Sequence, residues 1–544
     1  SDYMCPTDIY TIKVLMSLVI AGDTVFETAE LGIRIPKKEY REREPLLREE
    51  LLDLQRELRE FNEFPVIIVF AGVDGAGKSK TANLLNEWMD PRWLVTRAYD
   101  TPSQVESERP EFWRFWRDLP PKGQIGLFLS SWYSQPVCEH AYKKDDLPQF
   151  IHRLDRIINF ENALAEDNAV ILKFWMHLSR DAQKKRLKSL EKDPLTRWQV
   201  KERDWKHWHM YDQFVEAAER TILRTSTGKA PWTVVEGEDE NYRGLTVGTM
   251  IRDALAARLE DMRLQRELME KLRQETSTIK ADTVSKCGPD TSADELTIDR
   301  PPLTILGTLD MSKSMAKSDY QKDLKKYQAE LSVLCRQAEE RKISAVLVFE
   351  GPDAAGKGGA IRRITAPMQA YNYQVIPIAA PTDEEAAHHY LWRFWRQLPL
   401  AGRVLIFDRS WYGRELVERV EGFACEEEWK RAFAEINDFE DQLIDHGIVL
   451  VKYWIQISKE EQHVRFKARE ETPHKRWKLT EEDWRNREKW DDYELAVNDI
   501  IQHTSTIVAP WTLVEGNDKR YARIKVIRTL CQRLKEALNK NKKP

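Results

Sequence analysis

Residues 65–79 read Pro65-Val-Ile-Ile-Val-Phe-Ala-Gly-Val-Asp-Gly-Ala-Gly-Lys-Ser79. The run up to Phe70 is continuously apolar and rich in β-branched residues, which is typical of a buried strand in a parallel sheet. From Gly72 to Ser79 the spacing matches a phosphate-binding loop, whose glycines let backbone N–H groups wrap around phosphate oxygens. A helix is expected next, and its N-terminus favours an anion. This stretch therefore predicts an α/β fold with a phosphate site after its first strand.

The whole pattern occurs twice. The segment Trp113–Arg117 returns with the same letters as Trp392–Arg396, and the same offset carries Gly72 onto Gly351. In each copy an amphipathic helix precedes the first strand, and two further apolar runs follow the loop. Strands that alternate with helices indicate a parallel sheet covered on both faces. The expected helices lie at 42–60 and 318–341, and the expected strands at 65–70, 123–129, 169–174, 345–349, 403–407 and 448–454.

Composition places the domain boundaries. Residues 275–302 are rich in Ser, Thr, Asp, Gly and Pro with little apolar periodicity, so they are predicted to be a linker. Residues 1–25 match nothing later in the chain and are predicted to be an N-terminal extension. The first copy then spans 26–274 and the second spans 303–544.

Overall composition excludes several classes of protein. The 544 residues include 85 Lys and Arg and 90 Asp and Glu, a net charge of −5, so the global charge neither indicates nor excludes an anionic partner. We predict no nucleic-acid partner. The mean hydropathy of −0.60 argues against a membrane protein. The six cysteines are dispersed without a CxxC pair, which favours reduced thiols in a cytoplasm.

The second loop carries the candidate catalytic groups. It reads Gly351-Pro-Asp-Ala-Ala-Gly-Lys-Gly-Gly359, with Gly358 where a Mg²⁺-binding Ser or Thr normally stands. We expect Lys357 to reach the anion and Asp353 to hold Mg²⁺ instead of the missing hydroxyl. The next apolar run ends at Asp408, a position beside such loops where an acid serves Mg²⁺.

The first copy lacks this chemistry. Leu129 and Ser130 stand opposite Asp408 and Arg409, and a leucine cannot bind a hard cation. Cationic residues of the second copy are also replaced at the aligned positions of the first. Arg469 aligns with Leu190, Lys475 with Thr196, Lys519 with Glu240 and Arg414 with Gln135. We therefore predict that only the C-terminal copy is catalytic.

At these residues the sequence resembles the polyphosphate kinase type-2 family. The loop Gly351–Gly359 is similar to the family's distinctive Walker A motif, in which Gly follows the lysine, and Asp408–Tyr412 is similar to its Walker B motif. The lid Pro473–Trp484 and the tail Thr504–Lys519 are similar too. The resemblance covers the C-terminal half closely and the N-terminal half in degenerate form. It implies two tandem P-loop kinase-like domains, each a parallel sheet flanked by helices with a helical lid.

The two-copy arrangement is similar to a fused subgroup of that family. This resemblance implies transfer of the terminal phosphoryl group of inorganic polyphosphate to AMP, giving ADP, with Mg²⁺, by a cytoplasmic homo-oligomer. Three other readings stay open. They are an ATP-dependent nucleoside monophosphate kinase, a polyphosphate-dependent kinase of nucleoside diphosphates, and a nucleotide sensor that uses the first loop.

For phosphoryl transfer we assign four catalytic residues. Asp353 and Asp408 would hold Mg²⁺, with Asp353 also orienting the acceptor phosphate, while Lys357 and Arg409 would neutralise the moving group. Cationic side chains around the lid would line a channel for the long polyanion. The phosphate-binding residues are then Gly351, Ala354, Ala355, Gly356, Gly358, Gly359, Arg414, Arg465, Arg469, Lys475, Lys478, Lys519 and Arg520.

Overall fold

The computed structural model describes residues 25–282, 304–472 and 480–540, which form two compact units. One unit holds 25–101, 118–282 and Ala387–His389. The other holds Pro102–Arg117, 304–386 and the described residues from Tyr390 onward. Each unit therefore consists mainly of one repeat. Among the described residues, no helix is both long and apolar enough to cross a membrane.

The N-terminal repeat follows the order expected from its sequence, with additional short elements. Its helices and strands are η1 (Glu27–Ala29), α2 (Lys37–Phe61), β1 (Val66–Gly72), α3 (Lys78–Trp88), η2 (Pro91–Trp93), β2 (Leu94–Ala98), α4 (Gln104–Ser107), α5 (Trp113–Arg117), β3 (Ile125–Leu129), α6 (Ser134–Ala141), α7 (Leu147–Glu166), β4 (Val170–His177), α8 (Arg180–Lys192), η3 (Arg197–Gln199), α9 (Glu202–His209), α10 (Tyr211–Thr225), β5 (Trp232–Glu236) and α11 (Glu240–Asp282). Because α11 continues to Asp282, residues 275–282 are helical rather than part of a linker.

The C-terminal repeat has the same order. Its elements are η4 (Leu306–Thr308), α12 (Lys317–Glu340), β6 (Ala345–Glu350), α13 (Lys357–Thr365), β7 (Tyr373–Pro377), α14 (Asp383–Ala386), α15 (Trp392–Trp395), β8 (Val404–Asp408), η5 (Trp411–Arg414), α16 (Val417–Val420), α17 (Glu426–Asp445), β9 (Val449–Gln456), α18 (Lys459–Glu470), α19 (Glu481–Glu488), α20 (Trp490–Thr504), β10 (Trp511–Glu515) and α21 (Lys519–Lys540).

Each repeat builds a five-stranded parallel sheet, which confirms the predicted fold class. The strand orders are β2-β3-β1-β4-β5 and β7-β8-β6-β9-β10, so the two sheets have the same topology. The order reverses at β1 and at β6, the strands that precede the glycine-rich loops. Ligands of open parallel sheets bind at the carboxyl ends of the strands at such a switch point.

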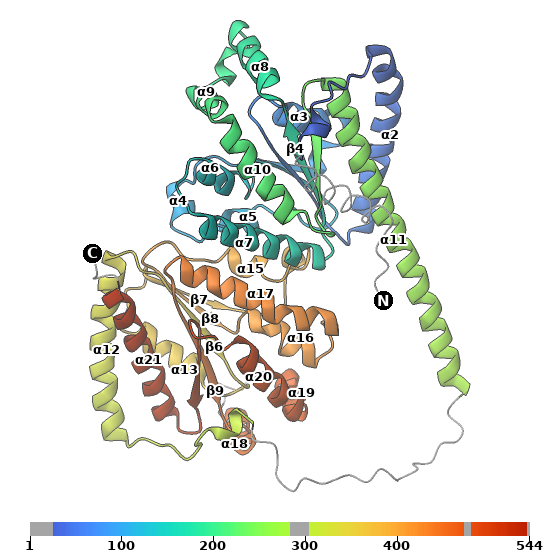
Figure 1. The fold of residues 1–544 in the computed structure, drawn as a ribbon. Coiled ribbons are helices and arrows are strands. Elements are labelled where there is room, and N and C mark those ends of the chain that lie inside the picture. The colour runs from blue at the N-terminus through green and yellow to red at the C-terminus, as the bar shows by residue number, and fades with distance from the viewer. Residues whose placement is uncertain (1–24, 283–303, 473–479, 541–544) are drawn as a thin grey trace. The chain divides into compact units, whose positions relative to one another are not determined.

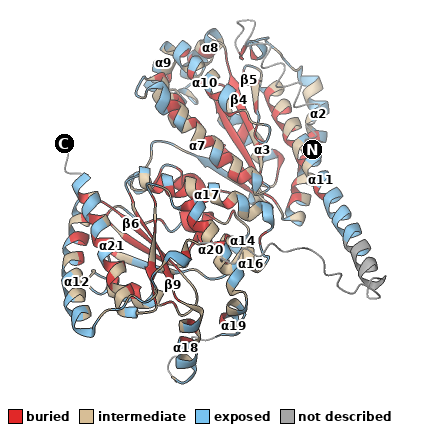
Figure 2. Ribbon diagram, turned by 60° about the horizontal axis from the view of Figure 1, so that its bottom comes forward, coloured by how far each residue is buried: buried red, intermediate tan, exposed pale blue. Residues whose placement is uncertain are grey.

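Helices cover both faces of each sheet. In the C-terminal unit α12, α13 and α21 pack on one face, while α17 and α20 lie on the other (Figure 1). The strands β1, β3, β4, β6, β8 and β9 are largely buried, and the helices bury only the side that faces the sheet (Figure 2). The aromatic residues of the two Trp-Arg-Phe-Trp-Arg segments are buried as well.

A buried polar network ties the second face of each sheet. In the C-terminal repeat Lys452, fully buried on β9, donates to Glu440 at 2.6 Å, to the carbonyl of Thr504 at 2.7 Å and to the Tyr412 hydroxyl at 3.1 Å. Burial raises the pKa of Glu440 and lowers that of Lys452, so each charge depends on the other. The N-terminal repeat has the same network around Lys173 and Glu161.

These networks predict a matched pair of stability effects. Glu440→Ala leaves the Lys452 ammonium buried without its partner, and we expect the C-terminal unit to lose about 3–5 kcal/mol of unfolding free energy. Glu161→Ala should do the same to the N-terminal unit. Hydrogen exchange under mild urea, followed separately for the amides of β9 and β4, measures both effects. Equal loss of protection in both sheets from either variant would show that the units do not unfold independently.

Candidate functional site

The second glycine-rich loop joins β6 to α13. Gly351 has a φ of +145°, and a Cβ there would lie 2.4 Å from the carbonyl oxygen of Ile455, so only glycine fits against β9. Lys357 is the first residue of α13, and its ammonium donates to the Gly351 carbonyl at 2.5 Å. The loop therefore offers an ammonium and a helix N-terminus to an anion. The predicted contacts Ala354, Ala355, Gly356, Gly358 and Gly359 all lie in this loop or in the first turn of α13.

Asp353 is the most highly connected side chain of the loop. Its two carboxylate oxygens accept hydrogen bonds of 3.0 Å from Arg409 and 3.0 Å from Asn486. Its carbonyl accepts one of 3.1 Å from Gln462. Burial alone would raise the pKa of Asp353, but the positive charges of Lys357 and Arg409 outweigh it and hold that pKa below its ordinary value. The carboxylate is therefore ionised at neutral pH.

Asp408 and Arg409 reach the loop through the pairing of β6 with β8. In that register Phe349 lies opposite Asp408, so the end of β8 stands beside the start of the loop. Asp408 is half-buried, and Arg409 follows it in a left-handed conformation with a φ of +67°. The structure thus brings together all four residues assigned as catalytic. Sequence reasoning missed a further acid, Glu350, whose pKa is raised by burial and which accepts a hydrogen bond of 2.7 Å from Ser410.

Arg465 has a different place from the predicted one. It is 5% exposed and lies behind the loop, where its guanidinium donates to the carbonyls of Ala354 and Ala355 at 2.9 and 2.8 Å. The remaining N–H groups bond to Glu461 at 2.6 Å and to the carbonyls of Gly516 and Asn517 at 2.6 and 3.0 Å. All five donors are occupied, so the expected phosphate contact of Arg465 is wrong. Its geometry is that of a residue that shapes the loop.

The other predicted cations are spread over three elements. Arg414 pairs with Glu418 at 3.0 Å, and Arg520 pairs with Asp518 at 3.4 Å, so both have acidic neighbours that compete with phosphate. The rest are Arg469 on α18, Lys519 at the start of α21, and Lys475 and Lys478, which lie outside the described residues.

One cation near the loop was not foreseen. Arg523 lies on α21, and its Nη2 would be 3.2 Å from a Cβ placed on Gly359, in the first turn of α13. Within the described part of the chain it makes no ion pair. The sequence held a signal for it, because the aligned residue of the N-terminal repeat is Gly244. Arg523 therefore differs between the repeats in the same way as the predicted cationic positions.

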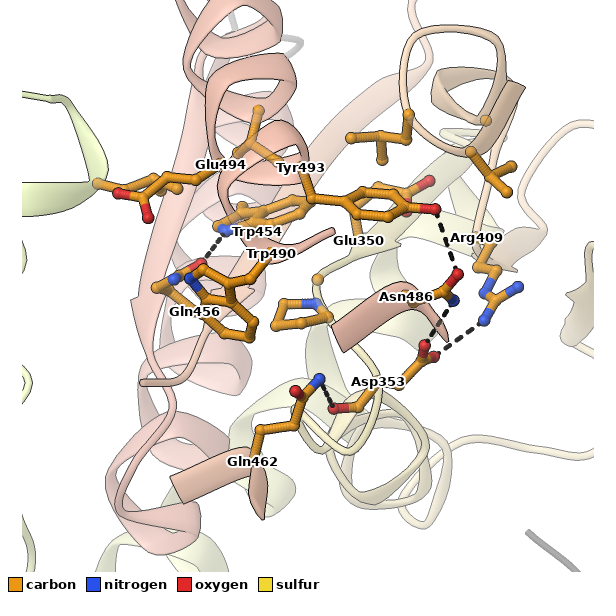
Figure 3. A pocket seen from close by; sticks show the side chains of 17 residues that line it. Glu350, Asp353, Arg409, Trp454, Gln456, Gln462, Asn486, Trp490, Tyr493 and Glu494 are labelled. Carbon is orange, nitrogen blue, oxygen red and sulfur yellow. Dashed lines mark hydrogen bonds and ion pairs between the residues drawn. The ribbon is translucent and has the colours of Figure 1, made fainter. Parts of the chain in front are cut away.

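An aromatic pocket opens beside Asp353. Trp454, Trp490 and Tyr493 supply its rings, and Asp353 and Arg409 line it as well (Figure 3). Figure 3 shows Asp353, Asn486 and Arg409 together on one side, while Trp454 and Trp490 lie on the other. The apolar lining is completed by Leu306, Leu416, Val417 and Val497. Such a pocket can stack a planar ring and present charged groups to a substituent of that ring.

In the N-terminal repeat, the residues aligned with the pocket lining pack against other aromatic side chains of the same repeat. Trp175 and His177 align with Trp454 and Gln456, and the ring of Phe26 stacks on His177 with centroids 4.4 Å apart. Phe26 is 2% exposed. Phe214, aligned with Tyr493, packs against His207 with centroids 4.5 Å apart. The N-terminal repeat thus keeps its loop but covers the counterpart of the pocket.

A different arginine lies behind the glycine-rich loop of the N-terminal repeat. Arg186 aligns with Arg465 but points to the surface, where it pairs with Glu240 at 3.6 Å. Arg243 takes its place, donating to the carbonyl of Gly237 at 2.8 Å, the counterpart of Gly516. The two repeats therefore hold similar loops with arginines from different helices.

Comparison with known proteins agrees with two related repeats. A family model described as Polyphosphate kinase 2 (PPK2) matches residues 34–263 and again residues 314–542. A polyphosphate:AMP phosphotransferase of Pseudomonas aeruginosa is 48% identical, over 95% of this chain and 100% of its own length. A protein of the same name from Pseudomonas syringae pv. tomato is 46% identical over 95% and 100%. A crystal structure from Pseudomonas aeruginosa PA01, described as a polyphosphate kinase 2, has a TM-score of 0.82 and 45% identity, covering 95% of this chain and 100% of that one.

The position of Arg465 predicts what its removal does. Arg465→Ala leaves four backbone carbonyls of the loop region unpaired, so we expect the C-terminal unit to lose about 3 kcal/mol and the amides of 351–360 to exchange faster. Arg186→Ala is the matched control, because it removes the aligned side chain from a partly exposed ion pair, and it should cost less than about 1 kcal/mol. Hydrogen exchange and thermal unfolding measure both. If Arg186→Ala lost as much unfolding free energy as Arg465→Ala, the two aligned arginines would have the same role, which would contradict this prediction.

Proposed function

The chain belongs to the polyphosphate kinase 2 family, and we propose that it transfers the terminal phosphoryl group of inorganic polyphosphate to AMP, giving ADP. The observation that carries this proposal is the junction of the aromatic pocket with the loop. Asp353 belongs to the loop, Arg409 bonds to it from the end of β8, and both line the pocket, so an acceptor in the pocket would meet a donor phosphate on the loop. Full-length relatives named polyphosphate:AMP phosphotransferase support the choice of donor and acceptor.

The pocket suits the nucleoside part of the acceptor. A purine can stack on the rings of Trp454, Trp490 or Tyr493, and stacking on aromatic side chains contributes roughly 1–3 kcal/mol per base. The 5′-phosphate then faces Arg409 and the loop. A purine pocket is equally compatible with an ATP-dependent nucleoside monophosphate kinase, because that enzyme also binds AMP as acceptor. The pocket therefore supports a nucleotide as acceptor, and the relatives' names support AMP as the acceptor and polyphosphate as the donor.

Two carboxylates at the loop fit a magnesium ion. Mg²⁺ prefers oxygen ligands and commonly takes one or two carboxylates together with substrate phosphates and water. Asp353 and Asp408 would hold it, and the described residues contain no cluster of three or more metal-ligating side chains. When bound, Mg²⁺ neutralises charge on the phosphates. Glu350 is a weaker candidate because burial raises the pKa of its carboxyl, against the lowering effect of the hydrogen bond from Ser410.

The protein's own groups act by position and charge. Phosphoryl transfer has a loose transition state whose charge is spread over oxygens, so electrostatic stabilisation supplies most of the acceleration. Lys357 and Arg409 place positive charge on the two sides of the transferring group. Asp353 orients the attacking oxygen of AMP, while Arg465 keeps the loop in shape behind it. The cations on α18 and α21 receive the rest of the polyphosphate chain.

The N-terminal repeat is proposed to be non-catalytic. It has Leu129, Ser130 and Ala71 in the positions of Asp408, Arg409 and Glu350, and aromatic side chains cover its pocket. We also propose that the protein forms homo-oligomers, as the family resemblance implies.

The first test concerns the division of labour between the repeats. Asp408→Asn removes one carboxylate from the loop, and we expect turnover to fall by at least about 10³-fold. Leu129→Ala, at the aligned position, should leave turnover nearly unchanged. ADP formation from AMP with Mg²⁺ and polyphosphate, in buffer free of nucleoside triphosphates, measures both. Equal losses of turnover from the two variants would refute a single catalytic repeat. ADP formed with ATP but not with polyphosphate would show that ATP is the phosphoryl donor.

A second test concerns the donor channel. Arg523→Ala removes a cation beside α13 that has no ion-pair partner among the described residues, so we expect the KM for polyphosphate to rise about tenfold, while the KM for AMP stays constant. Arg528→Ala changes an exposed arginine of the same helix and is the control. Steady-state kinetics at two ionic strengths separate the effects. An increased KM for AMP instead would place Arg523 on the acceptor side.

A further inference from the structure

The Asp353 carboxylate is held by a residue of α19 as well as by Arg409 after β8. Asn486, on α19, donates its amide N–H to Asp353 at 3.0 Å. The amide oxygen of Asn486 accepts a hydrogen bond of 3.4 Å from the Tyr493 hydroxyl, and Tyr493 is a wall of the aromatic pocket. Figure 3 shows the three side chains in line, from the pocket to the carboxylate. A single amide thus joins the wall of the pocket to the acid of the loop.

Helices α18 and α19 both contact Asp353. Gln462, on α18, donates to the carbonyl of Asp353 at 3.1 Å, and its amide oxygen accepts a hydrogen bond of 3.1 Å from Arg487, on α19. Arg487 also donates to the carbonyl of Lys459 at 2.5 Å, which fixes α19 against α18. Both the backbone and the side chain of Asp353 are therefore tied to α19.

The N-terminal repeat shows the same contacts without the link to a pocket. Gln183 still donates to the carbonyl of Asp74 at 3.1 Å, and His207, aligned with Asn486, bonds to the Asp74 carboxylate at 2.6 Å. Trp208 replaces Arg487, and the amide oxygen of Gln183 is buried without a partner among the described residues. Phe214 replaces Tyr493 and has no hydroxyl. The contact to the loop acid is common to both repeats, whereas the connection to the pocket exists only in the C-terminal one.

From this difference we propose that Asn486 is a positioning residue that fixes the Asp353 carboxylate and couples it, through Tyr493, to occupancy of the aromatic pocket. An acceptor that stacks on Tyr493 orders its hydroxyl, the hydroxyl orders the Asn486 amide, and the amide orients Asp353. The acceptor would in this way prepare the group that aligns its own attacking oxygen. This inference rests on the proposed function, because it assumes that the pocket holds the acceptor.

Kinetics of three variants test the coupling. Small errors in the position of a catalytic group can cost about 10²-fold in rate. We expect Asn486→Ala to lower kcat by about 10- to 100-fold with an unchanged KM for polyphosphate, and Tyr493→Phe to lower it by about threefold. The double variant should be no slower than Asn486→Ala, since residues of one network are not additive. Asn486→His should recover part of the loss, because His207 makes the equivalent bond to Asp74.

Controls separate this role from simple stabilisation and from the proposed function. His207→Ala is the matched control in the N-terminal repeat and should leave turnover unchanged. A kcat within twofold of wild type for Asn486→Ala, or additive losses in the double variant, would overturn the inference. If wild-type protein makes no ADP, the proposed function fails first. Hydrogen exchange then still tests the link, because AMP should slow exchange in residues 351–357 of the wild type but not of the Asn486→Ala variant.

Discussion

The parallel pairing of β6 with β8 is the interaction on which the site depends. Its register opposes Phe349 and Asp408, so the loop that begins at Gly351 leaves the sheet beside the Asp408 carboxylate. In the N-terminal repeat the same pairing opposes Phe70 and Leu129. The residue after the strand is left-handed in both, with a φ of +67° at Arg409 and +50° at Ser130. The hydrogen-bond ladder builds this turn whether or not the side chains can bind a metal ion.

The sequence predicts the elements that short local patterns specify. Long apolar runs and the glycine spacing were sufficient to predict three strands, the phosphate loop and the duplication. The outer strands were missed because they are short and partly exposed. In β7 the side chains are intermediate or exposed throughout, so no apolar run marks it. The end of α11 was also missed, since its last turns carry little apolar periodicity to distinguish a helix from a linker.

The candidate site was predictable only where a motif names its residues. Asp353, Lys357, Asp408 and Arg409 lie on the two motifs, and the fold brings them together. The rings of the pocket come from β9 and α20, and no local pattern connects those elements to the loop. Arg465 was misread because a cation on a lid-like helix was taken for a phosphate ligand, whereas its surroundings are backbone carbonyls. Only the folded chain shows which partner a long cationic side chain has.

The two repeats separate the demands of folding from those of chemistry. The buried lysine networks around Lys452 and Lys173 are the same in both, because an unpaired buried charge would destabilise either sheet. Two acids near the loop differ, since Leu129 and Ala71 stand in the positions of Asp408 and Glu350, while Asp74 stands in the position of Asp353. A buried guanidinium near the loop is common to both repeats, but the residue that supplies it differs. It belongs to Arg465 in the C-terminal repeat and to Arg243 in the N-terminal repeat. Arg465 bonds carbonyls of the loop itself, whereas Arg243 bonds the Gly237 carbonyl and the Thr81 hydroxyl.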